Sequence, residues 1–128
     1  MEFPDDLKYT REHEWARSRD GKVVIGITDF AQDQLGDVVY VELPGVGDEV
    51  KKGESFGVVE STKAVSELFA PVSGKVVEVN DPLTEAPEAI NEDPYEEGWM
   101  IAVAPSDPKE LAELMDAKAY RTFVEEQE

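Results

Sequence analysis

The stretch FGVVESTKAVSELFAP, residues 56–71, decides the fold. Two strand-like arms rich in Val and Phe flank the dipeptide Thr62-Lys63, and a turn signal follows at Ala70-Pro71. We predict a hairpin over about 56–70 with Lys63 at or beside its tip. A tight hairpin turn usually contains Gly, Asn or Asp, because these residues reach positive φ. Neither Thr62 nor Lys63 is of this kind, so local turn chemistry does not explain the sequence. An exposed lysine in a rigid turn is a feature that a modifying enzyme could recognise.

Outward from the hairpin, further short runs of Val and Ile are separated by Gly, Pro and acidic turns. Many short strands at close spacing favour a sandwich or barrel over a parallel sheet with crossover helices. We therefore predict a mainly β fold, a flattened barrel or sandwich in one domain of residues 1–128. The predicted strands are 22–27, 38–43, 56–61, 64–69, 75–79 and 99–103, with a weaker one at 10–15.

Two helices interrupt this β pattern. A short helix is predicted near 29–35, with Asp29 at its start. A C-terminal helix is predicted near 108–120, because Asp107 is a good N-cap and an apolar helical face follows. We expect this second helix to cover the sheet. Residues 81–98 contain three prolines and no regular pattern, so they are expected to form a long loop, which would be functional or mobile.

The charge balance is strongly acidic, with 30 Asp and Glu against 12 Lys and Arg and a formal net charge of -18. Nucleic-acid binding depends on neutralising phosphates with basic side chains, so we expect no nucleic-acid partner. An anionic membrane surface would repel the chain for the same reason. Two interpretations remain: the charge keeps the protein soluble, or partner proteins recognise it with basic docking surfaces.

The chain has no cysteine, which removes disulfides, thiolate metal sites and cysteine nucleophiles together and fits a reducing compartment. Its first ten residues, MEFPDDLKYT, do not read as a signal or transit peptide. No apolar run approaches the length that spans a membrane. We therefore expect a cytoplasmic protein without a membrane anchor, and a monomer.

No convincing catalytic or metal-binding constellation is present. The pentapeptide GESFG at 53–57 has the spacing of a hydrolase nucleophile elbow, but that motif needs a preceding strand, a following helix and a later histidine. Here a strand follows, and the single histidine, His13, lies upstream. His13 alone cannot form a zinc site without cysteines or further histidines. We predict neither catalytic nor metal-ligating residues.

The hairpin resembles the lipoyl and biotinyl attachment hairpin, in which one lysine receives the cofactor through an amide. Motifs along nearly the whole chain, from about Leu7 to Phe123, narrow this to a resemblance to the glycine cleavage H-protein family. They are LKY (7–9), HEW (13–15), GITDFAQ (26–32), GDVVYVELP (36–44), VESTKAVSE (59–67), SGKVVEVN (73–80) and DPYEEGWM (93–100).

This resemblance implies the flattened β-barrel or sandwich of the lipoyl/biotinyl attachment type, the barrel-sandwich hybrid. It also implies covalent lipoate on Lys63, added by a lipoylating enzyme, and a non-catalytic carrier. Its arm would take an aminomethyl group from a pyridoxal-dependent glycine decarboxylase to a tetrahydrofolate-dependent aminomethyltransferase. A dihydrolipoyl dehydrogenase would then reoxidise the arm.

The resemblance further implies that the loaded arm docks against the protein and is shielded from water. Glu12, His13, Glu14 and Glu67 are the candidate lining residues, because a carboxylate is the natural partner of a protonated amine. With 30 acidic residues in the chain, the alternative for Glu14 and Glu67 is a solvated face.

Two related roles stay open. One is a lipoyl or biotinyl domain of another multienzyme complex, although such domains sit in longer chains with flexible linkers and show DKA or MKM at the lysine. Here the tripeptide is Thr62-Lys63-Ala64, and no Ala/Pro-rich linker flanks the domain. The other is a relative that relays lipoyl groups to other proteins, which has the same hairpin.

Overall fold

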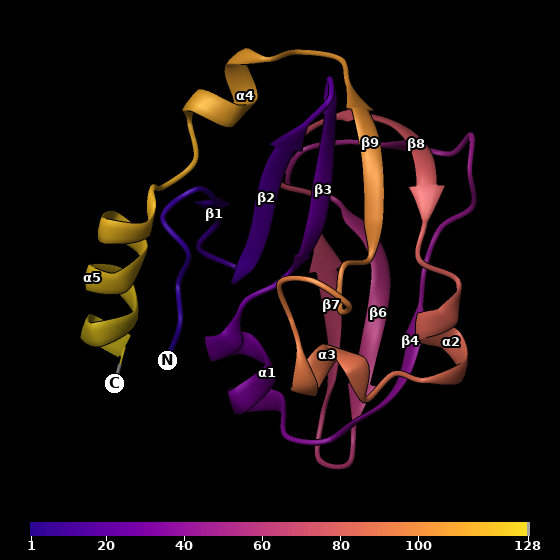
Figure 1. Cartoon of the computed structure of the whole chain (residues 1–128), viewed down its shortest axis with the longest axis vertical. Helices are drawn as coiled ribbons and strands as arrows, with labels where there is room; N and C mark the ends of the chain where they lie inside the picture. The colour runs from indigo at the N-terminus through magenta and orange to yellow at the C-terminus, as the bar shows by residue number, and fades with distance from the viewer. Residues whose placement is uncertain (128) are drawn as a thin grey trace.

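Two antiparallel sheets make up the fold in the computed structural model, which describes residues 1–127 (Figure 1). The larger sheet A contains, in spatial order, β1 (Lys8–Tyr9), β2 (Glu14–Arg19), β3 (Lys22–Ile27), β9 (Ile101–Pro105), β8 (Gly74–Val79) and β5 (Glu49–Val50). The smaller sheet B contains β4 (Val38–Glu42), β6 (Ser55–Ser61) and β7 (Val65–Phe69). The turn between β6 and β7 forms the lower tip of the molecule in Figure 1.

Alternation along the strands explains why the two sheets face each other. Val23, Ile25 and Ile27 of β3 are buried and share one apolar cluster with Val59 of β6 and Leu68 of β7. Residues two apart in a strand lie on the same face, so this pattern turns one face of each sheet inward. The mainly β, barrel-sandwich prediction is therefore confirmed.

A second, aromatic cluster lies beside the first and anchors the C-terminal helix α5 (Ala117–Gln127) next to β1, on the side where both chain termini lie (Figure 1). The rings of Tyr9 and Tyr120 stack with centroids 4.6 Å apart, and Phe3 meets Tyr120 edge-on at 5.1 Å. Such aromatic pairs contribute about 0.5–1.5 kcal/mol beyond area burial. The helix is thus fixed by residues more than 100 positions away in the sequence.

The predicted helix near 29–35 is confirmed as α1 (Asp29–Leu35), but its N-cap is Thr28 rather than Asp29. The Thr28 hydroxyl accepts a hydrogen bond from the Ala31 backbone N–H at 3.2 Å. The weaker strand predicted at 10–15 is misplaced, because a turn closed by the His13 N–H to Thr10 carbonyl bond delays the start of β2 until Glu14.

The C-terminal helix is present, but it is not continuous over 108–120. A short α4 (Lys109–Ala112) ends first, and α5 begins only at Ala117. Between them Met115 leaves the helical path and exchanges two backbone hydrogen bonds with Tyr9 (2.8 and 2.9 Å). Asp116 then caps α5 by accepting from the Ala119 N–H at 2.8 Å. Pairing with the N-terminal segment therefore replaces the helical hydrogen bonds at this point.

The prolines in residues 81–98 suggested a long loop without regular structure, and this prediction is wrong. These residues contain two short helices, α2 (Pro82–Glu85) and α3 (Ala89–Glu92), whose Leu83 and Ile90 are buried in the main core. The Asn91 side chain accepts from the Val38 N–H and donates to the Gly36 carbonyl. No helix in the described part of the chain is long and apolar enough to span a membrane.

Candidate functional site

The hairpin tip is the segment Ser61 to Ala64, which contains the last residue of β6 and the three residues that connect it to β7. The Ser61 N–H donates to the Ala64 carbonyl at 2.8 Å, and the Ser61 hydroxyl oxygen accepts from the N–H groups of Lys63 and Ala64 (3.3 and 3.1 Å). The Thr62 N–H donates to the Asp37 carbonyl at 3.0 Å. Neither turn residue has positive φ. A serine side chain and a carbonyl from a neighbouring segment thus hold a turn that lacks Gly, Asn and Asp.

Lys63 is exposed at this tip, and none of the ion pairs in the described part of the chain involves it. Its aliphatic stem runs over Gly36, where an added Cβ would lie 3.3 Å from the lysine Cε. Gly36 also has φ 78°, so a side chain there would be strained as well as crowded. The position presents a flexible amine with a clear approach, as covalent modification requires.

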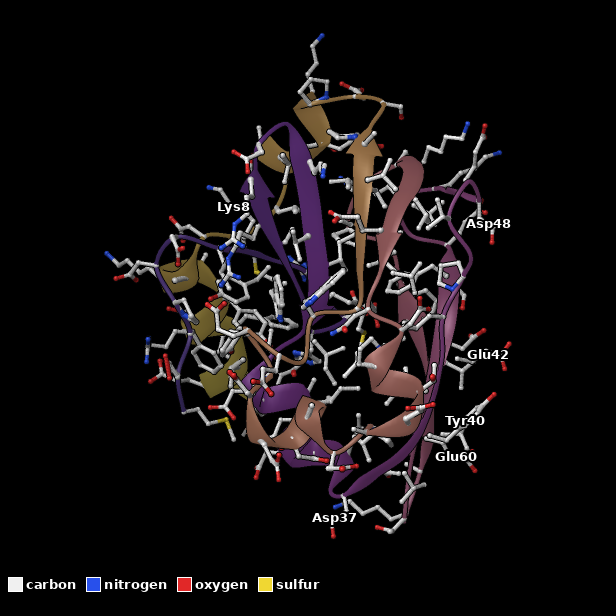
Figure 2. All side chains as sticks on the ribbon, turned by 45° about the vertical axis from the view of Figure 1, so that its right-hand side comes forward. Lys8, Asp37, Tyr40, Glu42, Asp48 and Glu60 are labelled. Atoms are coloured by element: carbon white, nitrogen blue, oxygen red, sulfur yellow. The ribbon has the colours of Figure 1, made fainter. Side chains whose placement is uncertain are left out.

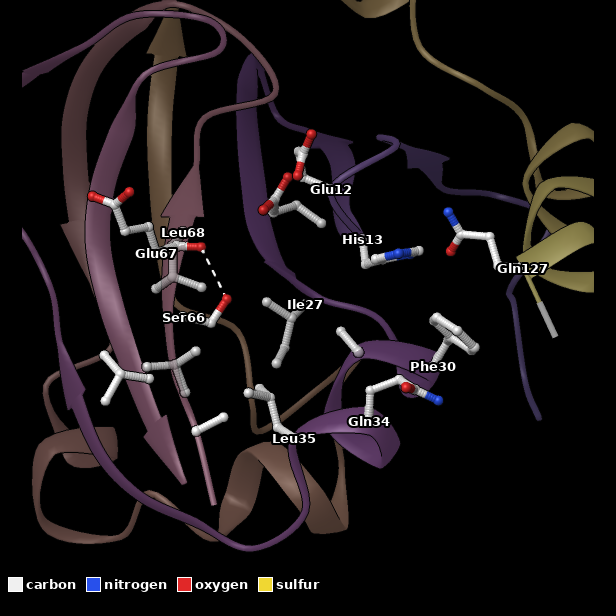
Figure 3. A pocket seen from close by; sticks show the side chains of 15 residues that line it. Glu12, His13, Ile27, Phe30, Gln34, Leu35, Ser66, Glu67, Leu68 and Gln127 are labelled. Carbon is white, nitrogen blue, oxygen red and sulfur yellow. Dashed lines mark hydrogen bonds between the residues drawn. The ribbon is translucent and has the colours of Figure 1, made fainter. Parts of the chain in front are cut away.

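A groove of about 760 Å³ begins beside this lysine and runs along β7, the free edge of sheet B, opposite α1 and the start of β2 (Figure 3). All four predicted lining residues are brought together in it. Its full lining is Glu12, His13, Glu14, Ile27, Phe30, Ala31, Gln34, Leu35, Val59, Ala64, Val65, Ser66, Glu67, Leu68 and Gln127. The groove therefore combines an apolar floor with three carboxyl groups.

His13 adopts a left-handed backbone conformation that explains how three consecutive residues reach one groove. Side chains alternate between faces along a regular strand, so Glu12, His13 and Glu14 could not all point to the same side. His13 has φ 73°, an uncommon conformation for a non-glycine residue. The Thr10 hydroxyl oxygen accepts from the N–H groups of Glu12 (3.2 Å) and Glu14 (3.1 Å) and so stabilises this turn.

Glu14 is a buried carboxyl group that links the two walls of the groove. Only 2% of its surface is exposed. One oxygen accepts from the Thr10 hydroxyl at 2.6 Å, and the other accepts from the Phe69 N–H of β7 at 3.2 Å. Burial raises the pKa of Glu14 to about 7, and these two hydrogen bonds oppose the rise. A solvated face is therefore wrong for Glu14, whereas Glu67 is exposed and fits that description.

His13 forms the opposite end of the groove from the hairpin. Its ring lies 4.8 Å from that of Phe30, and its Nδ1 is 2.8 Å from the Tyr120 hydroxyl of α5. Burial lowers the pKa of His13, while the charge of Glu12 and a hydrogen bond with the Gln127 side chain act in the opposite direction. Figure 3 shows the His13 and Gln127 side chains facing each other at this end.

Some residues of the site were not identified from the sequence. Ser61 had a usable signal, because serine is favoured at the first position of a turn. No sequence signal pointed to Thr10, Phe30 or Tyr120, because these residues reach the groove from separate segments of the chain.

The site fits a lipoyl group attached to Lys63. A lysine amine can form an amide bond, Lys63 makes no ion pair among the described residues, and the groove begins at Ala64 and Val65 directly after it. The floor of Ile27, Leu35, Val59 and Leu68 suits an alkyl arm, since apolar surface is stabilised by leaving water.

Comparisons with known proteins agree with this geometry. A family model described as "Glycine cleavage H-protein" matches residues 7–127. A "Glycine cleavage system H protein" of Anaeromyxobacter sp. (strain K) is 79% identical over 128 residues, covering 100% of both chains. One from Oceanobacillus iheyensis is 60% identical and covers 98% of this chain and 100% of its own. The crystal structure of an H protein from Mycobacterium marinum superposes with a TM-score of 0.87 at 45% identity, covering 94% of this chain and 97% of that one.

Proposed function

Since the chain belongs to the glycine cleavage H-protein family, whose members carry lipoyl groups in the glycine cleavage system, we propose that Lys63 is the attachment residue and that the arm shuttles an aminomethyl group. The observation that carries this proposal is the placement of an exposed lysine, which makes no ion pair within residues 1–127, at a hairpin tip beside the mouth of a groove. The lipoyl group would supply the sulfur chemistry, and the chain would supply position, access and shielding.

The groove is proposed to receive the loaded arm. Its apolar floor would cover the alkyl chain, and Glu12, Glu14 and Glu67 would face the protonated amine at the end. Charge-assisted hydrogen bonds of this kind are shorter and stronger than neutral ones. Because burial raises the pKa of Glu14 to about 7, a cationic partner would favour its ionised form and gain most from it above that pH.

Three enzymes would use the arm in turn: the pyridoxal-dependent glycine decarboxylase, the aminomethyltransferase and the dihydrolipoyl dehydrogenase. A lipoylating enzyme would act once, before them. A carrier that visits several enzymes needs fast encounters and fast release, which favours long-range attraction over a large buried interface. We propose that the carrier acts as a monomer, in one domain of residues 1–128.

The outer face of sheet B is the surface through which basic partner enzymes would approach Lys63. Strand pairing places Tyr40 opposite Glu60 and Glu42 opposite Val58. Figure 2 shows Tyr40, Glu42 and Glu60 on the same side of the molecule. Tyr40 is 47% exposed, its hydroxyl donates to Glu42 at 3.3 Å, and the charges of Glu42 and Glu60 raise the pKa of Tyr40. An arginine-bearing partner could stack on the ring and pair with the carboxylates.

Three experiments test this function. Intact mass of the protein from native cells should show one lipoyl group, and a glycine decarboxylation assay with the partner enzymes should show turnover that depends on it. Lipoylation without turnover would favour a relay relative or a domain of another complex.

In a salt series, the KM of the aminomethyltransferase for the loaded carrier should rise more than its KM for free lipoamide, because salt screens long-range attraction. An equal response would mean that the acidic surface serves only to keep the protein soluble.

A further inference from the structure

The hydroxyl of Tyr120 connects the groove histidine to a residue in the interior. It lies 2.8 Å from His13 Nδ1 and 2.7 Å from the hydroxyl oxygen of Thr28, the N-cap of α1. Tyr120 and Thr28 are both 0% exposed, so solvent does not complete this network. The three residues come from the turn before β2, the N-cap of α1 and the first turn of α5.

The available donors and acceptors fix the direction of the hydrogen bonds between Thr28, Tyr120 and His13. The Thr28 oxygen already accepts from the Ala31 N–H, and its own proton has one acceptor in the described structure, the Tyr120 oxygen. The Tyr120 proton is then directed to His13 Nδ1, which must be unprotonated to accept it. A neutral imidazole carries its single proton on the other nitrogen, so Nε2 is the donor.

Protonation of His13 would reverse these hydrogen bonds. Nδ1–H would then donate to Tyr120, Tyr120 would donate to Thr28, and the Thr28 proton would be left without an acceptor in a fully buried site. Leaving a buried donor unsatisfied is unfavourable. The network therefore opposes a positive charge on His13 through hydrogen-bond geometry, in addition to the effect of burial.

Beyond the proposed function, and resting on it, we propose that Tyr120 and Thr28 are positioning residues that hold His13 as the neutral Nε2–H tautomer, so that the groove presents no positive charge to the cationic end of the arm. Among the residues that line the groove there is no Lys or Arg, and His13 is the one side chain there that could become a cation. An imidazolium at this end would repel the ammonium group that the three carboxylates attract.

The charged and titratable groups around the imidazole are few. Glu12 and Glu14 lie on its own segment, and Glu67 lies across the groove on β7. Helix α5 contributes Tyr120, and α1 contributes only uncharged side chains to the groove. Arg11 is held over the ring of Phe123, with 5.6 Å from its guanidinium carbon to the ring centroid.

The test uses the fact that His13 is the only histidine in the chain, so its imidazole ¹⁵N resonances need no assignment. The unmodified wild type should show a proton on Nε2 and none on Nδ1 at neutral pH. In Tyr120→Phe, which keeps the ring stacked on Tyr9, the pKa of His13 should rise by about one unit. In Thr28→Val the pKa of His13 should stay low, because a charged His13 would still donate to Tyr120 and would leave the buried Tyr120 proton without an acceptor.

Tyr95→Phe is the matched control. The Tyr95 hydroxyl also makes two hydrogen bonds, from the Asp29 N–H and to the Glu2 carbonyl, but it does not touch His13. The control should titrate like the wild type. If Tyr120→Phe titrates like the wild type as well, burial alone keeps His13 neutral and the proposal is wrong. An equal rise in both variants would mean general loosening, which would also overturn it.

The second measurement concerns the loaded arm. After lipoylation and loading with glycine, Tyr120→Phe should lose its aminomethyl group to water several-fold faster than Tyr95→Phe at a pH where only the former has a charged His13. Equal loss rates would overturn the role of His13 in the groove, whereas the titrations on the unmodified protein would stand. A wild type without any lipoyl group would instead refute the proposed function and would leave the titrations unaffected.

Discussion

The hairpin tip and the wall that faces it across the groove are built in opposite ways. The tip is four consecutive residues, and its key side chain, Lys63, is exposed and makes no ion pair in the described structure. The wall is assembled from the segment around His13, from α1 and from α5, and its central carboxyl group, Glu14, is buried. Attachment chemistry needs reach and access, which a local turn provides. Shielding needs desolvated groups held in place, which requires packing between distant segments.

This contrast predicts that changes at the tip affect function with little effect on stability, while changes at the wall affect stability and its dependence on pH. Buried groups with raised or lowered pKa values are linked to folding, whereas groups that stay in water contribute little.

The largest effect is expected for Lys63→Arg. The variant keeps the positive charge but removes the acceptor amine, so lipoylation should be lost completely while the melting temperature stays the same. Mass spectrometry after coexpression with a lipoylating enzyme provides the measurement. Lys52→Arg, at an exposed lysine paired with Glu113 at 2.5 Å, is the control and should be lipoylated normally. A lipoyl amide on Lys51, Lys52 or Lys75 instead would refute the assignment.

The next largest effect is expected for the contribution of Glu14 to the pH dependence of folding stability. The pKa of Glu14 is raised from 4.5 to about 7, so the folded protein keeps this proton to higher pH than the unfolded chain does. Its contribution to stability is therefore fully present below pH 4.5, is lost as the pH rises to about 7, and is constant above that. Relative to Glu14→Gln, the wild type should lose up to about 3 kcal/mol over this range.

Urea unfolding of both proteins across the pH series measures that difference. Glu67→Gln is the matched control, because it removes a carboxyl from the same groove that stays in water on folding, and its difference from the wild type should stay flat. A flat difference for Glu14→Gln as well would mean that the Glu14 carboxyl is solvated in solution.

A smaller effect is expected for Ser61→Ala at the tip. The variant removes the acceptor for the N–H groups of Lys63 and Ala64, which should cost about 1 kcal/mol and slow lipoylation several-fold by loosening the turn. Denaturant unfolding and the initial rate of lipoylation are the two measurements. Ser66→Ala, whose hydroxyl donates only to the neighbouring Glu67 carbonyl, should change neither. Equal lipoylation rates for the two variants would show that the turn does not depend on Ser61.

The smallest effect is expected from lipoylation itself. The arms of the hairpin are already paired and Val59 and Leu68 are already buried, so the protein should fold before modification. Calorimetry of the unmodified and lipoylated forms should give similar melting temperatures. A cooperative melt that appears only after lipoylation would mean that folding depends on the cofactor.

The sequence predicted elements whose signals are local. Residues such as Val23, Ile25 and Ile27 carry the period-2 pattern of a strand wherever the strand sits, so most of the main strands and the hairpin were identified correctly. The short α1 was found for the same reason. The strand predicted at 99–103 was placed two residues too early, because β9 begins at Ile101. The C-terminal helix was placed too early, because the pairing of Met115 with Tyr9 depends on a contact between the two ends of the chain.

The sequence alone predicted, through the hairpin and its motifs, that Lys63 lies at the hairpin tip and that Glu12, His13, Glu14 and Glu67 lie together. Only the tertiary structure decided that Glu14 is buried rather than solvated, that His13 turns into the groove with φ 73°, and that Tyr120 meets His13 Nδ1. The physical reason is that burial and hydrogen-bond direction depend on which distant segments meet. Desolvation of Glu14 requires Phe69 and Thr10 together, and no run of neighbouring residues encodes that meeting.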